Sequence, residues 1–289
     1  MLKKIFQVSF LTSIVILFHC ATAMAWTVAP VRFEVNAEKG KEYTLTFSVL
    51  NESQLYQKRF EIQTDDWTID NKNNFLRKAF NKEVNNKYSA TSWIKVTPQQ
   101  FVVPPGGTKN IRFTIRIPNN LEALGEYSTG IFACEKNIEK PPKGEKIIHI
   151  KQDTYIGVVV YVRIGEEKPV VVLKDLKVDT KPITKGLNKV IVLPTFESQG
   201  NIHSRGQISV KLEPMDQNQA PKEYNAGEIV VLRESEVTFP IEIPEPLPTD
   251  SEWKITVSTD LGKKNPILVG TKKYKVPQIE IAETKKIDN

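Results

Sequence analysis

Side chains that commonly catalyse reactions or bind metals are few in this chain. Histidine occurs only at positions 19, 149 and 203, and cysteine only at positions 20 and 134. No two histidines stand at metal-ligand spacing, and the glycine-rich and nucleophile motifs of phosphate-binding and hydrolytic enzymes are missing. We therefore expect no catalytic residue, no metal and no cofactor.

Two local features could still suggest chemistry. Asp65, Asp66 and Asp70 lie close together, but no glutamate follows at the spacing of an EF-hand, so we interpret them as part of a polar segment. Cys134 ends an apolar run, where a buried and inert thiol is expected. Residues 67–88 are rich in asparagine and aspartate and are predicted to form a long surface loop.

The elements that must position any site begin after an export signal. Lys3 and Lys4 precede an apolar run at residues 5–18, and small residues fill most of positions 21–25. This order is typical of a secretory signal peptide, so we expect export and cleavage after Ala25. A lipid-modified Cys20 is disfavoured because His19 stands where a small residue should precede it. The apolar run is shorter than the roughly 20 residues that a membrane span needs, so no stable span is expected.

Most later apolar segments alternate apolar and polar residues and end at Gly, Pro, Asn or Asp, which is the pattern of β-strands. Seven such runs precede residue 165 and seven follow residue 169. We predict an all-β chain with two immunoglobulin-like antiparallel β-sandwich domains. The expected boundaries are a signal peptide at 1–25, sandwiches at 26–165 and 169–277, and a polar tail at 278–289.

An internal repeat favours this division. Residues 111–131 match residues 237–257 without a gap, at a constant offset of 126 positions. Each copy contains a strand, a proline-stopped turn and a second strand, as two copies of one kind of sandwich would. We predict that the repeated positions are core residues: Phe113, Ile115, Ile117, Pro118, Leu121 and Glu126, and in the second copy Phe239, Ile241, Ile243, Pro244, Leu247 and Glu252.

Protein binding is the function class that remains. The formal charge is +6, and lysines and glutamates are interspersed, so no nucleic-acid partner is expected. Ile148 and Ile150 alternate with His149 and Lys151 before a long β run that reaches residue 164. Such a strand can donate its edge to an incomplete partner. The alternative is an ordinary last strand that leads into the second domain.

Four segments of the first domain carry a resemblance to a known family. They are residues 28–33 (VAPVRF), 44–51 (TLTFSVLN), 94–107 with its TP and VPPGG, and 111–118 (IRFTIRIP). Through them, residues 26–164 resemble the PapD-like periplasmic chaperones of pilus and fimbrial assembly. The second domain resembles a generic bacterial immunoglobulin-like module, through residues 200–203, 246–248 and 253–257.

The resemblance implies a mechanism and site residues. Members of the family are two sandwiches set in a boomerang, and they cap a subunit by lending it a strand. An arginine and a lysine in their cleft hold the subunit's terminal carboxylate. The resemblance therefore implies partner-binding roles for Arg32, as the arginine, and for Ile148, Ile150, Lys151 and Tyr155. Positions 152–162 contain no basic residue where the family's lysine would fall, so Lys151 is the candidate substitute.

The function that the resemblance implies is a periplasmic chaperone for protein subunits of a surface organelle. Further implied partners are an outer-membrane usher and, through self-capping, a second copy of this chain. The alternative function is an accessory immunoglobulin-like envelope protein that acts in adhesion or as a scaffold. An enzyme built from carboxylates far apart in the sequence is a third reading.

Overall fold

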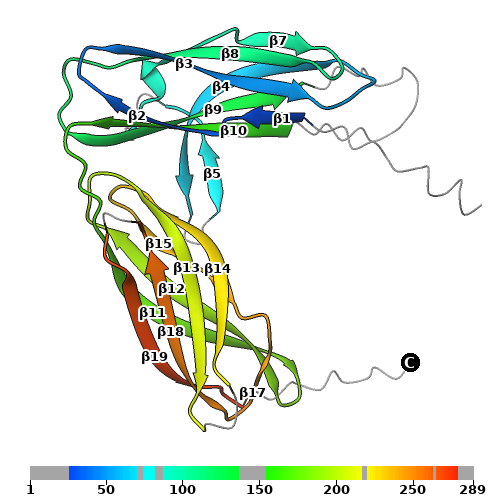
Figure 1. Cartoon of the computed structure of the whole chain (residues 1–289), viewed down its shortest axis with the longest axis vertical. Coiled ribbons are helices and arrows are strands. Elements are labelled where there is room, and N and C mark those ends of the chain that lie inside the picture. The colour runs from blue at the N-terminus through cyan, green and yellow to red at the C-terminus, as the bar shows by residue number, and fades with distance from the viewer. Residues whose placement is uncertain are drawn as a thin grey trace, which may run out of the picture.

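The computed structural model describes residues 26–70, 74–81, 87–136, 154–216, 220–262 and 265–278. Within these ranges the chain is almost entirely β-strand, and the only helical element is the short 3-10 helix η1 (Thr91–Trp93). The strands form four sheets that pack as two sandwiches (Figure 1). The predicted fold class is confirmed. The signal peptide expected at 1–25 and the tail from 279 lie outside the described residues.

The first sandwich contains two sheets. One has the order β1-β3-β8-β6, with bounds β1 (Trp26–Ala29), β3 (Glu42–Asn51), β8 (Thr108–Arg116) and β6 (Ile94–Thr97). The other has the order β2-β10-β9-β4-β5, with bounds β2 (Arg32–Ala37), β10 (Thr154–Ile164), β9 (Gly125–Glu135), β4 (Lys58–Ile69) and β5 (Phe75–Lys78). Strand β7 (Gln100–Val103) also pairs with β4. The chain thus changes sheets between β1 and β2.

The core of the first sandwich follows from the alternation in its strands. Side chains two residues apart on a strand point to the same face, and Ile111, Phe113 and Ile115 of β8 are fully buried. Ile131 and Val160 meet them from the other sheet and belong to the same core cluster. Full burial of each such side chain contributes about 1.5–3 kcal/mol, so these strands hold the sandwich together without a disulfide.

The second sandwich has the same plan. In one sheet β12 (Leu187–Ser198) pairs with β11 (Val171–Thr184), β15 (Glu236–Thr238), β16 (Ile241–Glu242) and β17 (Leu247–Pro248). The other has the order β14-β13-β18-β19, with bounds β14 (Lys222–Val231), β13 (Ser204–Pro214), β18 (Glu252–Asp260) and β19 (Leu268–Lys275). The core includes the fully buried Phe196, Val210 and Val257.

The segment between the sandwiches is held by backbone and amide contacts. Asn201 donates its backbone N–H to Lys168 O at 3.0 Å and its side-chain Nδ2 to Glu166 O at 2.9 Å. Its own carbonyl accepts from the N–H of Glu126, in the first sandwich, at 2.8 Å. The two sandwiches lie at an angle and meet at one end of each (Figure 1). These bonds tie the connecting segment to both sandwiches.

The prediction of a long surface loop at residues 67–88 is wrong in part. Strand β4 continues to Ile69 and pairs with β5 in a hairpin, which projects from the first sandwich toward the second (Figure 1). Trp67 stacks on Phe75, with ring centroids 5.2 Å apart, and Arg77 donates to Asp65 at 2.6 Å. The hairpin forms because these partners lie on both of its strands, although its connecting residues are polar. Residues 71–73 and 82–86 lie outside the described part.

The repeated positions are also not all core residues. The apolar members Phe113, Ile115 and Ile117 and their counterparts are buried, as predicted. Pro244 and Glu252 are instead exposed. Glu126 is buried but polar, because it lies where the first sandwich meets the second. The two copies therefore share a strand pattern and differ in what surrounds it.

Candidate functional site

The N-terminal half of β10 has a free edge. Strand β9 pairs with β10 along its whole length, from Thr154 to Ile164. On the other side β2 pairs with β10 in parallel, but only from Val159 onward. No strand among the described residues pairs with the first five residues of β10 on that side. An unpaired strand edge of this kind can accept another strand.

The backbone direction along this edge can be assigned. Val159 donates its N–H to the carbonyl of Val31 at 2.9 Å, so it points away from β9. Backbone groups on a strand alternate in direction, so Gly157 and Tyr155 present their N–H and C=O groups to the same side. These groups are the donors and acceptors that an added strand would use.

A cavity of about 840 Å³ lies along this edge. Its walls come from the crossover between β1 and β2, from β10, from the β4–β5 hairpin and from the second sandwich. The lining residues are Val28, Ala29, Pro30, Val31, Arg32, Phe75, Tyr155, Gly157, Val159 and Arg205. The cavity therefore begins at the free edge and ends where β2 takes over the pairing.

Two guanidinium groups line the cavity from different sandwiches. Arg32 is the first residue of β2, its side chain is 45% exposed, and its Nε lies 3.5 Å from Glu34 Oε1. Arg205 of β13 forms an ion pair with Glu228. Its Nε is buried and has no hydrogen-bond partner among the described residues. Guanidinium groups bind carboxylates through paired hydrogen bonds, so the cavity favours an anionic ligand.

Aromatic rings form the wall of the cavity on the hairpin side. Phe132 is fully buried beneath this wall, with Tyr155 edge-on at 5.7 Å and Phe75 tilted at 6.2 Å between ring centroids. Arg77 covers the Phe132 ring at 4.6 Å. Phe75 and Tyr155 remain 43% and 47% exposed. Half-exposed aromatic side chains in a concave site are typical of protein-binding surfaces.

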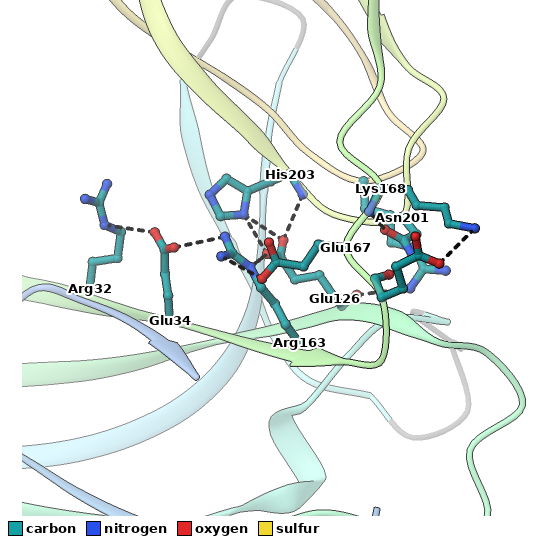
Figure 2. A network of polar contacts seen from close by, with 10 residues as sticks. Arg32, Glu34, Glu126, Arg163, Glu167, Lys168, Asn201 and His203 are labelled. Atoms are coloured by element: carbon teal, nitrogen blue, oxygen red, sulfur yellow. Dashed lines mark hydrogen bonds and ion pairs between the residues drawn. The ribbon is translucent and has the colours of Figure 1, made fainter. Parts of the chain in front are cut away.

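A buried polar network joins the sandwiches beside the cavity (Figure 2). Glu126 is 4% exposed and accepts from Arg163 Nε at 3.0 Å. It also accepts from the backbone N–H of His203 at 3.1 Å, and its Oε2 lies 2.7 Å from His203 Nδ1. Arg163 further contacts Glu34 at 2.9 Å, and Glu34 in turn contacts Arg32. The network thus connects the cavity to the contact between the sandwiches.

Aromatic stacking supports the same contact. The His203 ring lies parallel to Tyr161, with centroids 3.9 Å apart and planes at 22°. Tyr161 is nearly fully buried, and burial raises the pKa of its hydroxyl well above the usual value. Its ring also meets Trp67 edge-on at 5.9 Å, so β4, β10 and β13 are held together here.

The structure places two of the five predicted site residues in the cavity. Arg32 and Tyr155 both line it, from β2 and β10. Ile148, Ile150 and Lys151 lie outside the described residues, immediately before β10. Their partner-binding roles stay predictions.

Three cavity residues from separate strands were not predicted as site residues. Gly157, Phe75 and Arg205 were not singled out, although all three line it. A glycine inside a β-branched run is a recognisable signal of close approach by another group. Nothing in the local sequence marks Arg205, because it lines the same cavity as Arg32 only where the two sandwiches meet.

The other chemical candidates are held within the fold. Cys134 is buried, and burial raises the pKa of its thiol. Asp66 accepts from Thr91 at 2.7 Å, while Asp65 accepts from Arg77. These carboxylates therefore stabilise the base of the β4–β5 hairpin.

Comparison with known proteins gives structural neighbours only. No family model matches the chain, and no curated protein matches it. The chain is similar to fimbrial chaperones. The class 5 fimbriae chaperone CfaA is 15% identical, with 88% of this chain and 100% of that chain covered and a TM-score of 0.41. The E. coli chaperone DraB is 13% identical, with 86% and 96% covered and a TM-score of 0.41.

A third neighbour is a complex. It contains the Salmonella enterica SafA pilin and the SafB chaperone. The matching chain of this complex is 11% identical, with 87% of this chain and 98% of that chain covered and a TM-score of 0.41. At this level of similarity the neighbours show the fold alone. Among the described residues, no helix is long and apolar enough to cross a membrane.

Proposed function

We propose that this chain is a periplasmic chaperone that binds subunits of a surface organelle through the free edge of β10. The observation that carries the proposal is the position of this edge, which runs directly into a cavity lined by Arg32 and Arg205. Binding at a strand edge supplies main-chain hydrogen bonds, and the cavity supplies selectivity. No chemistry beyond binding is needed for this role.

The geometry of the edge limits how a strand can bind. A strand added beside residues 154–158 would lie in line with β2, which begins at Arg32. The added strand must therefore end near Val31 and Arg32, because β2 already occupies the rest of the edge. A chain terminus fits this position better than the middle of a long strand.

Charge then selects which terminus is bound. Arg32 and Arg205 would repel an amino group and attract a carboxylate. With its carboxyl end at Arg32, the partner strand would run parallel to β10, in the same sense as β2. We infer that the ligand is the C-terminal strand of a subunit. This assignment gives Arg32 the anchoring role that the sequence resemblance implies and adds Arg205 as its second cation.

The segment before β10, at residues 137–153, lies outside the described residues, and only its sequence bears on binding. Ile148 and Ile150 alternate with His149 and Lys151, so their apolar side chains share one face of an extended chain. We propose that this segment continues the pairing with the subunit and covers its apolar groove. Lys151 and Tyr155 would then border the bound strand.

A binding measurement tests the proposal. We expect genes for an outer-membrane usher and for incomplete sandwich subunits beside the gene for this chain. One of these subunits is the ligand for the binding measurement. Arg32→Ala and Arg205→Ala should each weaken binding about 10- to 100-fold, as the loss of a charged hydrogen bond worth about 1.5–3 kcal/mol would. Ile148→Asp and Ile150→Asp should abolish it, because a charge would be buried.

Arg116→Ala is the matched control. Arg116 is an exposed strand arginine that pairs with Glu42 at 2.9 Å and does not line the cavity. Its variant should bind like the wild type. Unchanged binding by all four test variants would contradict the chaperone proposal, and an absence of usher and subunit genes would favour an envelope scaffold.

A further inference from the structure

We propose that each arginine of the cavity carries an internal counter-ion, which competes with the bound carboxylate and so speeds its release. The two pairs are Arg32 with Glu34 and Arg205 with Glu228. This inference rests on the proposed function, since it assumes a carboxylate in the cavity. It adds a control of affinity and release that strand addition does not require.

The first pair lies on one strand. Arg32 and Glu34 share a face of β2, because side chains two residues apart on a strand point the same way. Arg32 Nε lies 3.5 Å from Glu34 Oε1. Arg32 lines the cavity, whereas Glu34 lines an adjoining hollow of about 320 Å³. Glu34 therefore leaves the space for the ligand free and acts on the ligand through the charge of Arg32.

Arg163 holds Glu34 on the side away from Arg32 (Figure 2). Arg163 Nη2 lies 2.9 Å from Glu34 Oε2, and Arg163 Nε donates to Glu126 at 3.0 Å. The Arg163 side chain is only 14% exposed, against 45% for Arg32. The ion pair with Arg163 is thus the shorter and the less accessible to water. Glu34 therefore stays with Arg163 when Arg32 turns to a ligand.

The second pair lies on the other sandwich and has a similar arrangement. Arg205 of β13 forms an ion pair with Glu228 of β14, and both side chains are partly exposed. Gln207 lies opposite Glu228 in the sheet, so Glu228 reaches Arg205 diagonally. Arg205 lines the cavity and Glu228 does not. In both pairs the arginine meets the ligand, while its glutamate lies outside the cavity lining.

These counter-ions change the charge that a ligand meets. Each pair carries no net charge, so a ligand carboxylate must share the arginine with a glutamate or take it from that glutamate. Ion pairs between partly exposed side chains are weak, so this exchange is reversible. The arginines still orient the carboxylate, while the glutamates keep its affinity moderate and its release fast.

Two synthetic peptides test the competition on the whole chain. Both are ten residues long, alternate Val and Thr and carry a fluorescent label at the N-terminus, and they end in either a free carboxylate or an amide. In fluorescence polarisation at low salt, Glu34→Gln and Glu228→Gln should each bind the carboxylate peptide about two- to fivefold more tightly than the wild type does. Affinity for the amide peptide should not change. Glutamine keeps the size of the side chain and removes its charge.

Two controls connect the gain in affinity to the arginines. Glu42→Gln removes the charge of an exposed glutamate that pairs with Arg116 at 2.9 Å and does not line the cavity. It should leave both affinities unchanged. In an Arg32→Ala background, Glu34→Gln should lose most of its gain, because no guanidinium remains to compete for. A full gain in that background would overturn competition for Arg32.

Dissociation kinetics measure the effect on release. The labelled peptide is displaced by excess unlabelled peptide in a stopped-flow instrument. Loss of either counter-ion should slow dissociation of the carboxylate peptide about two- to fivefold, because most differences in affinity between variants of one site lie in the dissociation rate. A gain confined to the association rate would overturn the claim about release.

The outcomes separate this inference from the proposed function. Weaker binding of the amide peptide by the wild type, with no gain in either glutamine variant, would overturn the counter-ions and leave carboxylate anchoring intact. A preference for the carboxylate that appears only in the glutamine variants would support both claims. A gain in one variant alone would support that pair and overturn the other. Equal binding of the two peptides by every variant, or binding of neither peptide, would overturn both claims.

Discussion

Glu126 offers the sharpest test of how the two sandwiches are held together. Its carboxylate accepts from the His203 backbone N–H at 3.1 Å and lies 2.7 Å from His203 Nδ1. Glu126→Ala would leave both groups of the buried His203 without an acceptor. Arg163 would keep its contact with Glu34 at 2.9 Å. The hydrogen bonds that are lost are therefore mainly those of His203, on the second sandwich's side of the contact.

The magnitude follows from these contacts. Two hydrogen bonds to a charged acceptor, each worth about 1.5–3 kcal/mol, give an expected fall of about 3–6 kcal/mol in the free energy of unfolding. Glu126→Gln keeps the shape of the side chain and one acceptor oxygen, so it should lower the free energy of unfolding by a smaller amount. Urea unfolding followed by tryptophan fluorescence measures both values. Both variants should also be cleaved faster by a protease between residues 165 and 170, because the contact beside the connecting segment would be weaker.

The internal repeat supplies the matched control. Glu252 occupies the position that corresponds to Glu126, 126 residues later, and is exposed. Glu252→Ala should change the free energy of unfolding by no more than about 0.5 kcal/mol. Equal effects of Glu126→Ala and Glu252→Ala would refute the claim that the buried network stabilises the contact between the sandwiches.

Two further predictions concern the interior of the first sandwich. Asn51→Ala should lower the free energy of unfolding by about 2–4 kcal/mol in urea titrations, because the fully buried amide donates to Val103 O at 3.2 Å and to two other carbonyls. The exposed Asn110→Ala is its control, and equal losses would contradict the assignment. Burial of Cys134 raises the pKa of its thiol and covers it, so the thiol should react with a disulfide reagent at pH 8 more slowly in the native than in the unfolded chain. Equal rates would contradict this prediction.

The strands and their inward faces could be predicted from the sequence because they depend on local alternation. Phe113 in β8 and Phe239, directly after β15, are both buried, as the repeat indicated. This alternation needs only information that neighbouring residues carry. Arg32, which lines the cavity, was assigned through the family resemblance, and its anchoring role stays a prediction.

The missed features depend on contacts between distant segments. The β4–β5 hairpin was predicted as a loop because its residues are polar, and the pairing of Trp67 with Phe75 across it is invisible in a strand pattern. Arg205 reaches the cavity only because the two sandwiches meet beside it. Glu126 is buried while its counterpart Glu252 is exposed, since only the first copy faces another domain at this position.

Amide hydrogen exchange tests strand addition at β10 most directly. In the free chain the N–H groups of Gly157 and Tyr155 point to an edge with no partner strand among the described residues, so they should exchange quickly. Binding of a subunit should slow both amides by about 100-fold or more, in alternation with their neighbours. At a subunit concentration that just saturates the wild type, protection should be clearly smaller in Arg32→Ala, because this variant should bind about 10- to 100-fold more weakly. Unchanged exchange at both amides in a saturated complex would contradict strand addition at β10.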